Sequence, residues 1–136
     1  MAPTEAALDA AGAQAIFPDW PQRRRRQALA ADLAELGVPF PDVEPSTLPD
    51  DPAAITGALY VIEGSRLGGR FLARQVGEGL PRRYLSPGER PPSWPALLEQ
   101  FERFLYSSAT YATATGAALA VFERFEAAGR RWLGRA

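Results

Sequence analysis

Three glycines and a serine stand close together within residues 57–76, GALYVIEGSRLGGRFLARQV. Gly64 and Gly68 are four residues apart, and Ser65 and Gly69 repeat this spacing, so in a helix they form a strip almost without side chains. Each interior glycine costs about 1 kcal/mol relative to alanine. The strip therefore predicts that another group approaches this backbone closely, either a neighbouring helix or a ligand.

Three interpretations of this stretch compete. Close packing of two helices is the one that the pattern alone favours, because small residues four apart permit it. A strand ALYVIE followed by a phosphate loop GSRLGG fits poorly, since the spacing is G-x-x-x-G-G and no Gly-Lys-Ser/Thr follows. The third interpretation is a kinked helix whose bare face lies against a flat ligand.

The amino-acid composition excludes several kinds of catalytic site. All 15 basic residues are arginine, and the chain has no lysine, histidine or cysteine. A Ser-His-Asp triad, a cysteine nucleophile, a lysine Schiff base, a disulfide and the common zinc sites are therefore excluded. We expect no metal site built from side chains of these types.

The length and the charge indicate a globular protein. The 136 residues are 46% hydrophobic with a net charge of -1, which suits one domain over residues 1–136 and gives no reason to expect nucleic acid as a partner. The N-terminus lacks the basic start and apolar core of a signal peptide, and no apolar run is long enough to span a membrane. We expect a cytoplasmic protein without a membrane partner.

The pattern along the chain predicts an all-α fold, because strand signals are nearly absent. Asp51-Pro52 is a strong helix start, Ser93 can cap a helix beginning near Trp94, and four prolines make residues 38–51 a loop. A proline- and glycine-rich connection covers 80–93. The expected helices cover 4–15, 20–37, 52 to 76 or 79, the stretch from Trp94 with Leu97, Leu98, Phe101, Phe104 and Leu105 buried, and 109–133 with Ala118, Phe122, Phe125 and Trp132 on one face.

The glycine stretch also resembles a known family. LYVIEGSRLGGRFLARQV is similar to the distal-helix motif of bacterial biliverdin-producing heme oxygenases, the type associated with bacteriophytochromes. RRRRQALAADLAELGVPFP, a proline-broken loop and the motif helix follow that family's order, and AALAVFERFEAAGRRWL resembles its closing helix. The resemblance covers nearly the whole chain.

The resemblance implies an activity and a set of site residues. Family members open heme, which is both substrate and cofactor, with dioxygen and electrons from a donor protein, and they release biliverdin, carbon monoxide and iron. By resemblance, Gly64 and Gly68 are the backbone positions over the heme, Gly69 widens a kink, and Ser65 lies near the distal water network. Tyr60 would reach a heme propionate; without the family, a core tyrosine with a surface hydroxyl is an equal interpretation.

One departure from the family concerns the iron ligand. Family members bind the iron through a histidine on their first helix, whereas this chain has none and resembles the family from partway through its second helix. Met1, Tyr60, Tyr84, Tyr106 and Tyr111 are not convincing replacements. We therefore expect weak heme binding without histidine ligation, and self-association through uncovered apolar helix faces. The rival hypotheses are a non-catalytic remnant of the fold that binds heme or a protein, and a pocket for another flat ligand.

Two charged features carry no predicted role. Arg23–Arg26 invites an anionic partner, but four consecutive arginines on a helix point in different directions, so we expect them to be mostly solvated. Glu63 precedes Gly64, and a lone glutamate in a helix is usually a surface or capping group.

Overall fold

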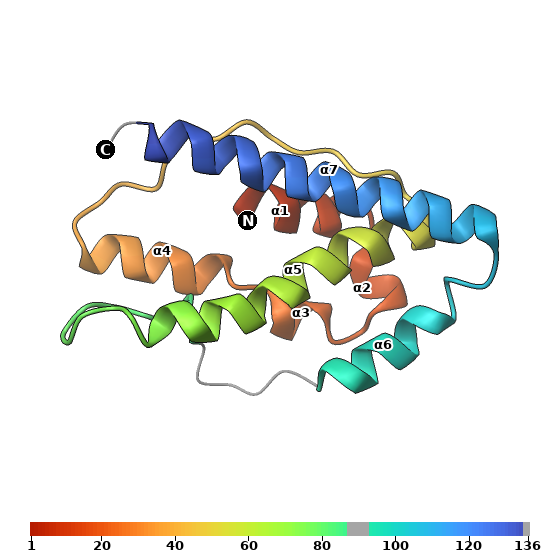
Figure 1. Ribbon diagram of the computed structural model, residues 1–136, viewed down its shortest axis with the longest axis horizontal. Helices are drawn as coiled ribbons and strands as arrows, with labels where there is room; N and C mark the ends of the chain where they lie inside the picture. Colours follow the sequence, from red (N-terminus) through yellow and green to blue (C-terminus); the bar gives the residue numbers. More distant parts are fainter. Residues whose placement is uncertain (87–92, 135–136) are drawn as a thin grey trace.

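The computed structural model describes residues 1–86 and 93–134 and shows helices but no strand in these ranges (Figure 1). The all-α class is therefore confirmed. The predicted connection at 80–93 lies partly outside the described residues, at 87–92. The helices are α1 (Ala2–Ala10), α2 (Ala13–Ile16), α3 (Trp20–Arg23), α4 (Arg26–Glu35), α5 (Pro52–Ala73), α6 (Trp94–Glu102) and α7 (Ser108–Leu133).

Helix α5 begins where its sequence predicts. The Asp51 carboxylate accepts hydrogen bonds from the backbone N–H groups of Ala53 and Ala54 at 2.8 and 3.4 Å, and Pro52 follows it at the first helical position. The helix then continues without interruption to Ala73, so the strand and phosphate-loop interpretation is wrong. A bend at residues 64–69 stays a prediction.

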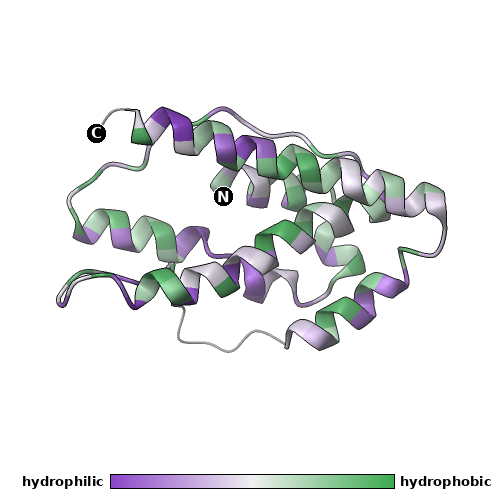
Figure 2. Ribbon diagram, in the orientation of Figure 1, coloured by the Kyte–Doolittle hydropathy of each residue, from purple (hydrophilic) through white to green (hydrophobic). Residues whose placement is uncertain are grey.

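Helices α5 and α7 cross, and this is the most extensive contact between two helices of the described chain (Figure 1). At the crossing the α5 backbone at Gly57 approaches Ala114 so closely that a Cβ on Gly57 would overlap the Ala114 carbonyl group. Figure 2 shows hydrophobic residues gathered near this crossing and bands of hydrophilic residues in the C-terminal half of α7. A glycine of this helix therefore does serve close packing, but it is Gly57, which the sequence did not single out.

The first two predicted helices are each broken in two. Gly12 adopts the left-handed conformation, with φ 85°, and separates α1 from α2. Arg24 is extended, with ψ 137°, and separates α3 from α4. Helix α4 begins with help from α1, because the carboxylate of the buried Glu5 accepts hydrogen bonds from the backbone N–H groups of Arg25 and Arg26 at 2.9 and 3.2 Å.

The core lies between the N-terminal helices, the first half of α5, and α6. The ring of Phe17 meets Phe101 edge-on with centroids 5.6 Å apart, and the Trp20 indole donates to Asp9 at 2.6 Å. The predicted buried face of α6 is confirmed at Leu97 and Phe101, whereas Leu98 is exposed. The fully or nearly fully buried apolar residues include Leu8, Phe17, Trp20, Ile55, Leu59, Ile62, Leu97 and Phe101.

The predicted apolar face of α7 is only partly correct. Phe122 and Trp132 are about half exposed, while Ala114 and Val121 are the buried residues of this helix. Like α5, helix α7 is capped at its start by nearby residues: Ser107 and Thr110 form a reciprocal capping box. Among residues 1–86 and 93–134, no helix combines the length and the apolar character needed to cross a membrane.

Candidate functional site

The bare strip of α5 is open at Gly68. A Cβ placed there would meet nothing within 4 Å, and at Gly64 it would meet only the Trp94 indole, at 3.8 Å. Gly69 lies closer to a neighbour, since a Cβ there would be 3.1 Å from the carbonyl oxygen of Leu85. Helix packing therefore does not account for Gly68, although it was the interpretation that the pattern alone favoured.

A cavity of about 430 Å³ lies beside this strip, and it includes three of the predicted site residues, Ser65, Gly68 and Gly69. This volume is within the range of about 300–1,000 Å³ that is usual for ligand pockets. The lining is mainly apolar and comes from the chain start, α5, α7 and the segment after α5. The other lining residues are Met1, Arg25, Leu72, Tyr84, Leu85, Phe125 and Ala128.

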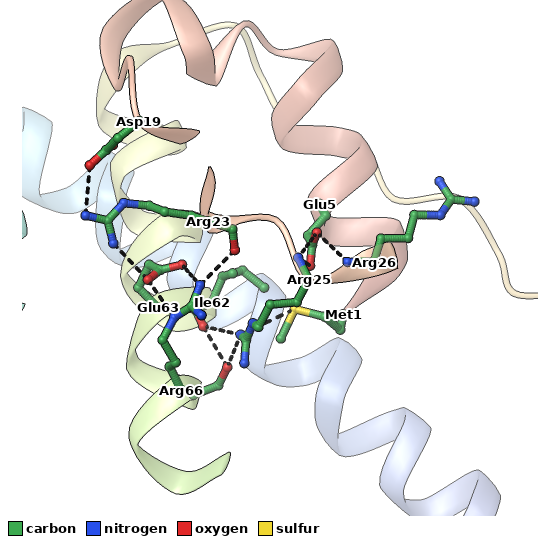
Figure 3. Close-up of polar contacts among 10 residues, drawn as sticks. Met1, Glu5, Asp19, Arg23, Arg25, Arg26, Ile62, Glu63 and Arg66 are labelled. Atoms are coloured by element: carbon green, nitrogen blue, oxygen red, sulfur yellow. Dashed lines mark hydrogen bonds and ion pairs between the residues drawn. The ribbon is translucent and has the colours of Figure 1, made fainter. Parts of the chain in front are cut away.

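Arg25 is the charged side chain that lines this cavity. Figure 3 shows it reaching from the segment before α4 to Ile62 of α5. Its side chain is buried, and one guanidinium nitrogen donates to the Ile62 carbonyl at 2.8 Å and to the Ser65 hydroxyl at 2.9 Å. The guanidinium also lies over the ring of Tyr84, 5.1 Å from its centroid. The Arg25 Nε is buried without a hydrogen-bond partner among the described residues.

The expectation that Arg23–Arg26 are mostly solvated is wrong for two of the four residues. Arg23 and Arg25 are buried, at 1% and 3% exposure, while Arg24 and Arg26 are exposed. The reason is the extended Arg24: alternate side chains of an extended segment point to opposite sides, whereas a helix would have spread them around its axis.

The expectation for Glu63 is also wrong, because this side chain is only 3% exposed. Figure 3 shows its carboxylate between Arg23 and Arg66. Its Oε2 accepts from Arg23 at 2.9 Å and from Arg66 at 3.1 Å, and its Oε1 accepts from Arg66 at 3.1 Å. Arg66 also donates to the backbone carbonyl of Arg23 at 2.7 Å. This cluster fixes the segment before α4 against α5 and thereby places Arg25 at the cavity.

Tyr60 is separated from the other predicted site residues. It is 47% exposed, and its ring packs on Trp94 with centroids 5.6 Å apart. It lines a different apolar pocket, of about 350 Å³, between α5, α6 and α7. Its role toward a propionate stays a prediction.

The cavity lining offers few ligands for a heme iron. Histidine, cysteine, methionine and tyrosine are the side chains that ligate heme in proteins, and here only Met1 and Tyr84 qualify. Burial raises the pKa of the Tyr84 hydroxyl, with the charge of Arg25 opposing, so Tyr84 is a neutral phenol at pH 7. The residues thus fit the face of a porphyrin, but they provide no imidazole for its iron.

Comparison with known proteins identifies the family. A heme oxygenase of Xanthomonas campestris pv. campestris is 38% identical over 112 residues, which cover 78% of this chain and 67% of that protein. The chain belongs to the heme oxygenase family. The heme oxygenase PigA of Pseudomonas aeruginosa is 38% identical over 88 residues, covering 58% of this chain and 44% of PigA. No protein-family model and no solved structure matches the chain.

The sequence analysis predicted the cavity residues that lie on α5 but did not predict the lining residues from other segments. Arg25, Tyr84 and Phe125 come from three other segments, and only the fold brings them to Ser65 and Gly68. The one sequence signal for Arg25 was its place in an arginine run, which suggested solvation rather than burial.

Proposed function

We propose that α5 and the cavity beside it form one wall of a heme site, and that the protein opens heme with dioxygen and electrons from a donor protein to give biliverdin, carbon monoxide and iron. One observation carries the proposal. In a member of the heme oxygenase family, Gly68 leaves the helix open beside a mainly apolar cavity of about 430 Å³.

The residues around the cavity have distinct proposed roles. Gly64 and Gly68 let the porphyrin face approach the backbone, Gly69 adds to this freedom, and Phe125 excludes water from the apolar edge. Bound heme would supply the iron that reacts with dioxygen. Ser65 has a hydroxyl that already donates to the Ile62 carbonyl at 2.6 Å, so it can accept a further hydrogen bond from water.

Arg25 holds that hydroxyl in place and contributes a positive charge to the cavity wall. We further propose that Tyr60, on the exposed face one turn before Gly64, contacts a propionate. The absence of histidine from the chain favours a second candidate function, a non-catalytic member of the fold that binds heme or a protein.

A matched pair of substitutions tests the heme site. Gly68→Leu fills the open strip, whereas Gly116→Leu places the same side chain on α7, where a Cβ also meets nothing within 4 Å and the residue does not line this cavity. Both replace an interior helix glycine, so neither is expected to destabilise the fold. Hemin is titrated into each protein with and without added imidazole, and binding is followed by the visible spectrum.

We expect the wild type and Gly116→Leu to bind hemin weakly alone and more tightly with imidazole, with a change to a histidine-like spectrum. Gly68→Leu should weaken hemin binding by at least about tenfold, both with and without imidazole, because a leucine at this position occupies the space for the porphyrin ring. Equal binding by the two variants would contradict the heme site on α5.

A chimera tests the activity. The chain is joined to the first helix of the Xanthomonas relative, which by family resemblance carries the iron-binding histidine, and biliverdin is assayed with heme, oxygen and a reductant. Ring opening that is lost in Gly68→Leu supports the enzyme. A histidine-ligated heme complex without ring opening would favour the non-catalytic candidate.

A further inference from the structure

A second cavity lies on the opposite side of α5. It has a volume of about 250 Å³ and shares no lining residue with the first cavity. Its α5 residues are centred about 160° around the helix from Ser65, Gly68, Gly69 and Leu72, at about 100° per residue. Its lining residues are Arg23, Glu63, Arg66, Leu67, Arg70, Ser93 and Trp94.

The cavity wall has an excess of positive charge. It holds three arginines and one carboxylate, and both oxygens of that carboxylate, on Glu63, already accept hydrogen bonds from Arg23 and Arg66. Asp19, outside the lining, forms an ion pair with Arg23 at 3.0 Å. Even with Asp19 counted, one positive charge is left over.

Donors for an anion are also left over. The exposed Arg70 side chain makes no hydrogen bond or ion pair with any described residue. Arg23, in contrast, is 1% exposed and donates to Glu63 and Asp19, so it adds positive charge behind the cavity wall and no free donor.

The remaining wall is apolar and fits the body of an organic molecule. Leu67 is 55% exposed, and the half-buried Trp94 indole presents a flat aromatic surface. Arginines beside a leucine and an indole suit a ligand with one anionic end and one apolar end. Phosphate, in contrast, would leave Trp94 and Leu67 without a partner.

We propose that this second cavity binds a small organic carboxylate, with the carboxylate on Arg70 and Arg66 and the apolar part against Trp94 and Leu67. This inference does not depend on the heme site, because the two cavities share no residues. It assigns the buried Arg23–Glu63–Arg66 cluster a binding role in addition to its structural one.

Titration calorimetry with benzoate, acetate and inorganic phosphate at constant ionic strength tests the proposal, with Trp94 fluorescence as a second readout. Benzoate should bind at least about tenfold more tightly than acetate or phosphate, which corresponds to about 1.4 kcal/mol. Arg70→Gln should weaken benzoate binding by about fivefold to tenfold. Arg74→Gln, an exposed arginine at the end of α5 that lines neither cavity, should leave it unchanged.

The thermal unfolding temperature of Arg70→Gln checks that the variant folds, which is expected because Arg70 is exposed. The proposal is overturned if benzoate shows no saturable binding, if phosphate binds as tightly as benzoate, or if folded Arg70→Gln binds benzoate like the wild type.

Discussion

Glu63 is a carboxylate held between two arginines that are themselves buried. Its partners Arg23 and Arg66 are 1% and 7% exposed, so each guanidinium has given up most of its hydration. A buried ion pair adds little net stability compared with apolar residues, but removing one partner leaves a buried charge uncompensated. The cluster is therefore sensitive to loss of its single central anion.

Glu63→Gln is expected to lower the free energy of unfolding by about 3 kcal/mol, because Arg23 and Arg66 then lose their shared counter-charge. Urea denaturation followed by circular dichroism measures the change. The control is Glu126→Gln, which removes an exposed pair with Arg130 and should change stability by less than about 1 kcal/mol. Similar small effects for both substitutions would mean that the cluster is hydrated in solution.

The sequence could not predict that Arg23 joins this cluster, because Arg23 is 40 residues from Glu63 and 43 residues from Arg66 along the chain. The prediction that Arg23–Arg26 lie within one helix was also wrong, because the backbone of Arg24 is extended. This one extended residue determines which of the four arginines are buried. In contrast, Ser65, Gly68 and Gly69 were predicted as neighbours because their spacing within one helix fixes their positions.

At the scale of elements, α5 shows two different uses of glycine. Near its start Gly57 admits the backbone of α7, while about three turns later Gly68 faces open space. The helix caps at Asp51 and Ser93 and the helix over 109–133 were predicted, because each depends on residues close together in the sequence. The close approach at Gly57 depends on where α7 lies, and no local pattern encodes that.

Gly57→Ala is expected to destabilise the protein by about 1–3 kcal/mol, since the added methyl group would overlap the Ala114 carbonyl and force the helices apart. Gly116→Ala, in α7 with open space around it, should instead be neutral or stabilise by up to about 1 kcal/mol. Thermal and urea unfolding of the two variants measure the difference. A stabilising Gly57→Ala would show that α5 and α7 are further apart than described.

At the scale of the whole molecule, α5 and α7 present several large apolar side chains to solvent. Singly exposed apolar residues are ordinary, but clusters on adjacent helices tend to become interfaces. The residues that are more than half exposed on these helices are Leu67, Phe71, Leu72, Tyr111, Leu119, Phe122, Trp132 and Leu133.

We expect the purified chain to self-associate through this surface at micromolar concentration. Sedimentation velocity measures the association, and Phe71→Glu should shift it toward monomer by placing a charge in the interface. Leu36→Glu is the control, because Leu36 is 51% exposed but lies at the end of α4. A monomer at all concentrations would show that these side chains remain solvated.

The complete cavity could not be predicted from the sequence. Its α5 side follows from one short motif, whereas Tyr84 and Phe125 reach it from distant parts of the chain. The glycine motif and the family resemblance thus located the site, and the fold supplied its remaining walls.

The carboxylate of Glu5 ties the beginning of α4 to α1, and its burial raises the pKa of this group against the opposing backbone hydrogen bonds. Arg25 is held by hydrogen bonds at its backbone and at its side chain. Its backbone N–H donates to Glu5, and its guanidinium donates to the Ile62 carbonyl of α5. If α1 detaches, the first turn of α4 loses its acceptor and Arg25 loses its anchor. Local unfolding of α1 should therefore spread to the cavity as one cooperative event, so the site exists only while the N-terminal helix stays docked.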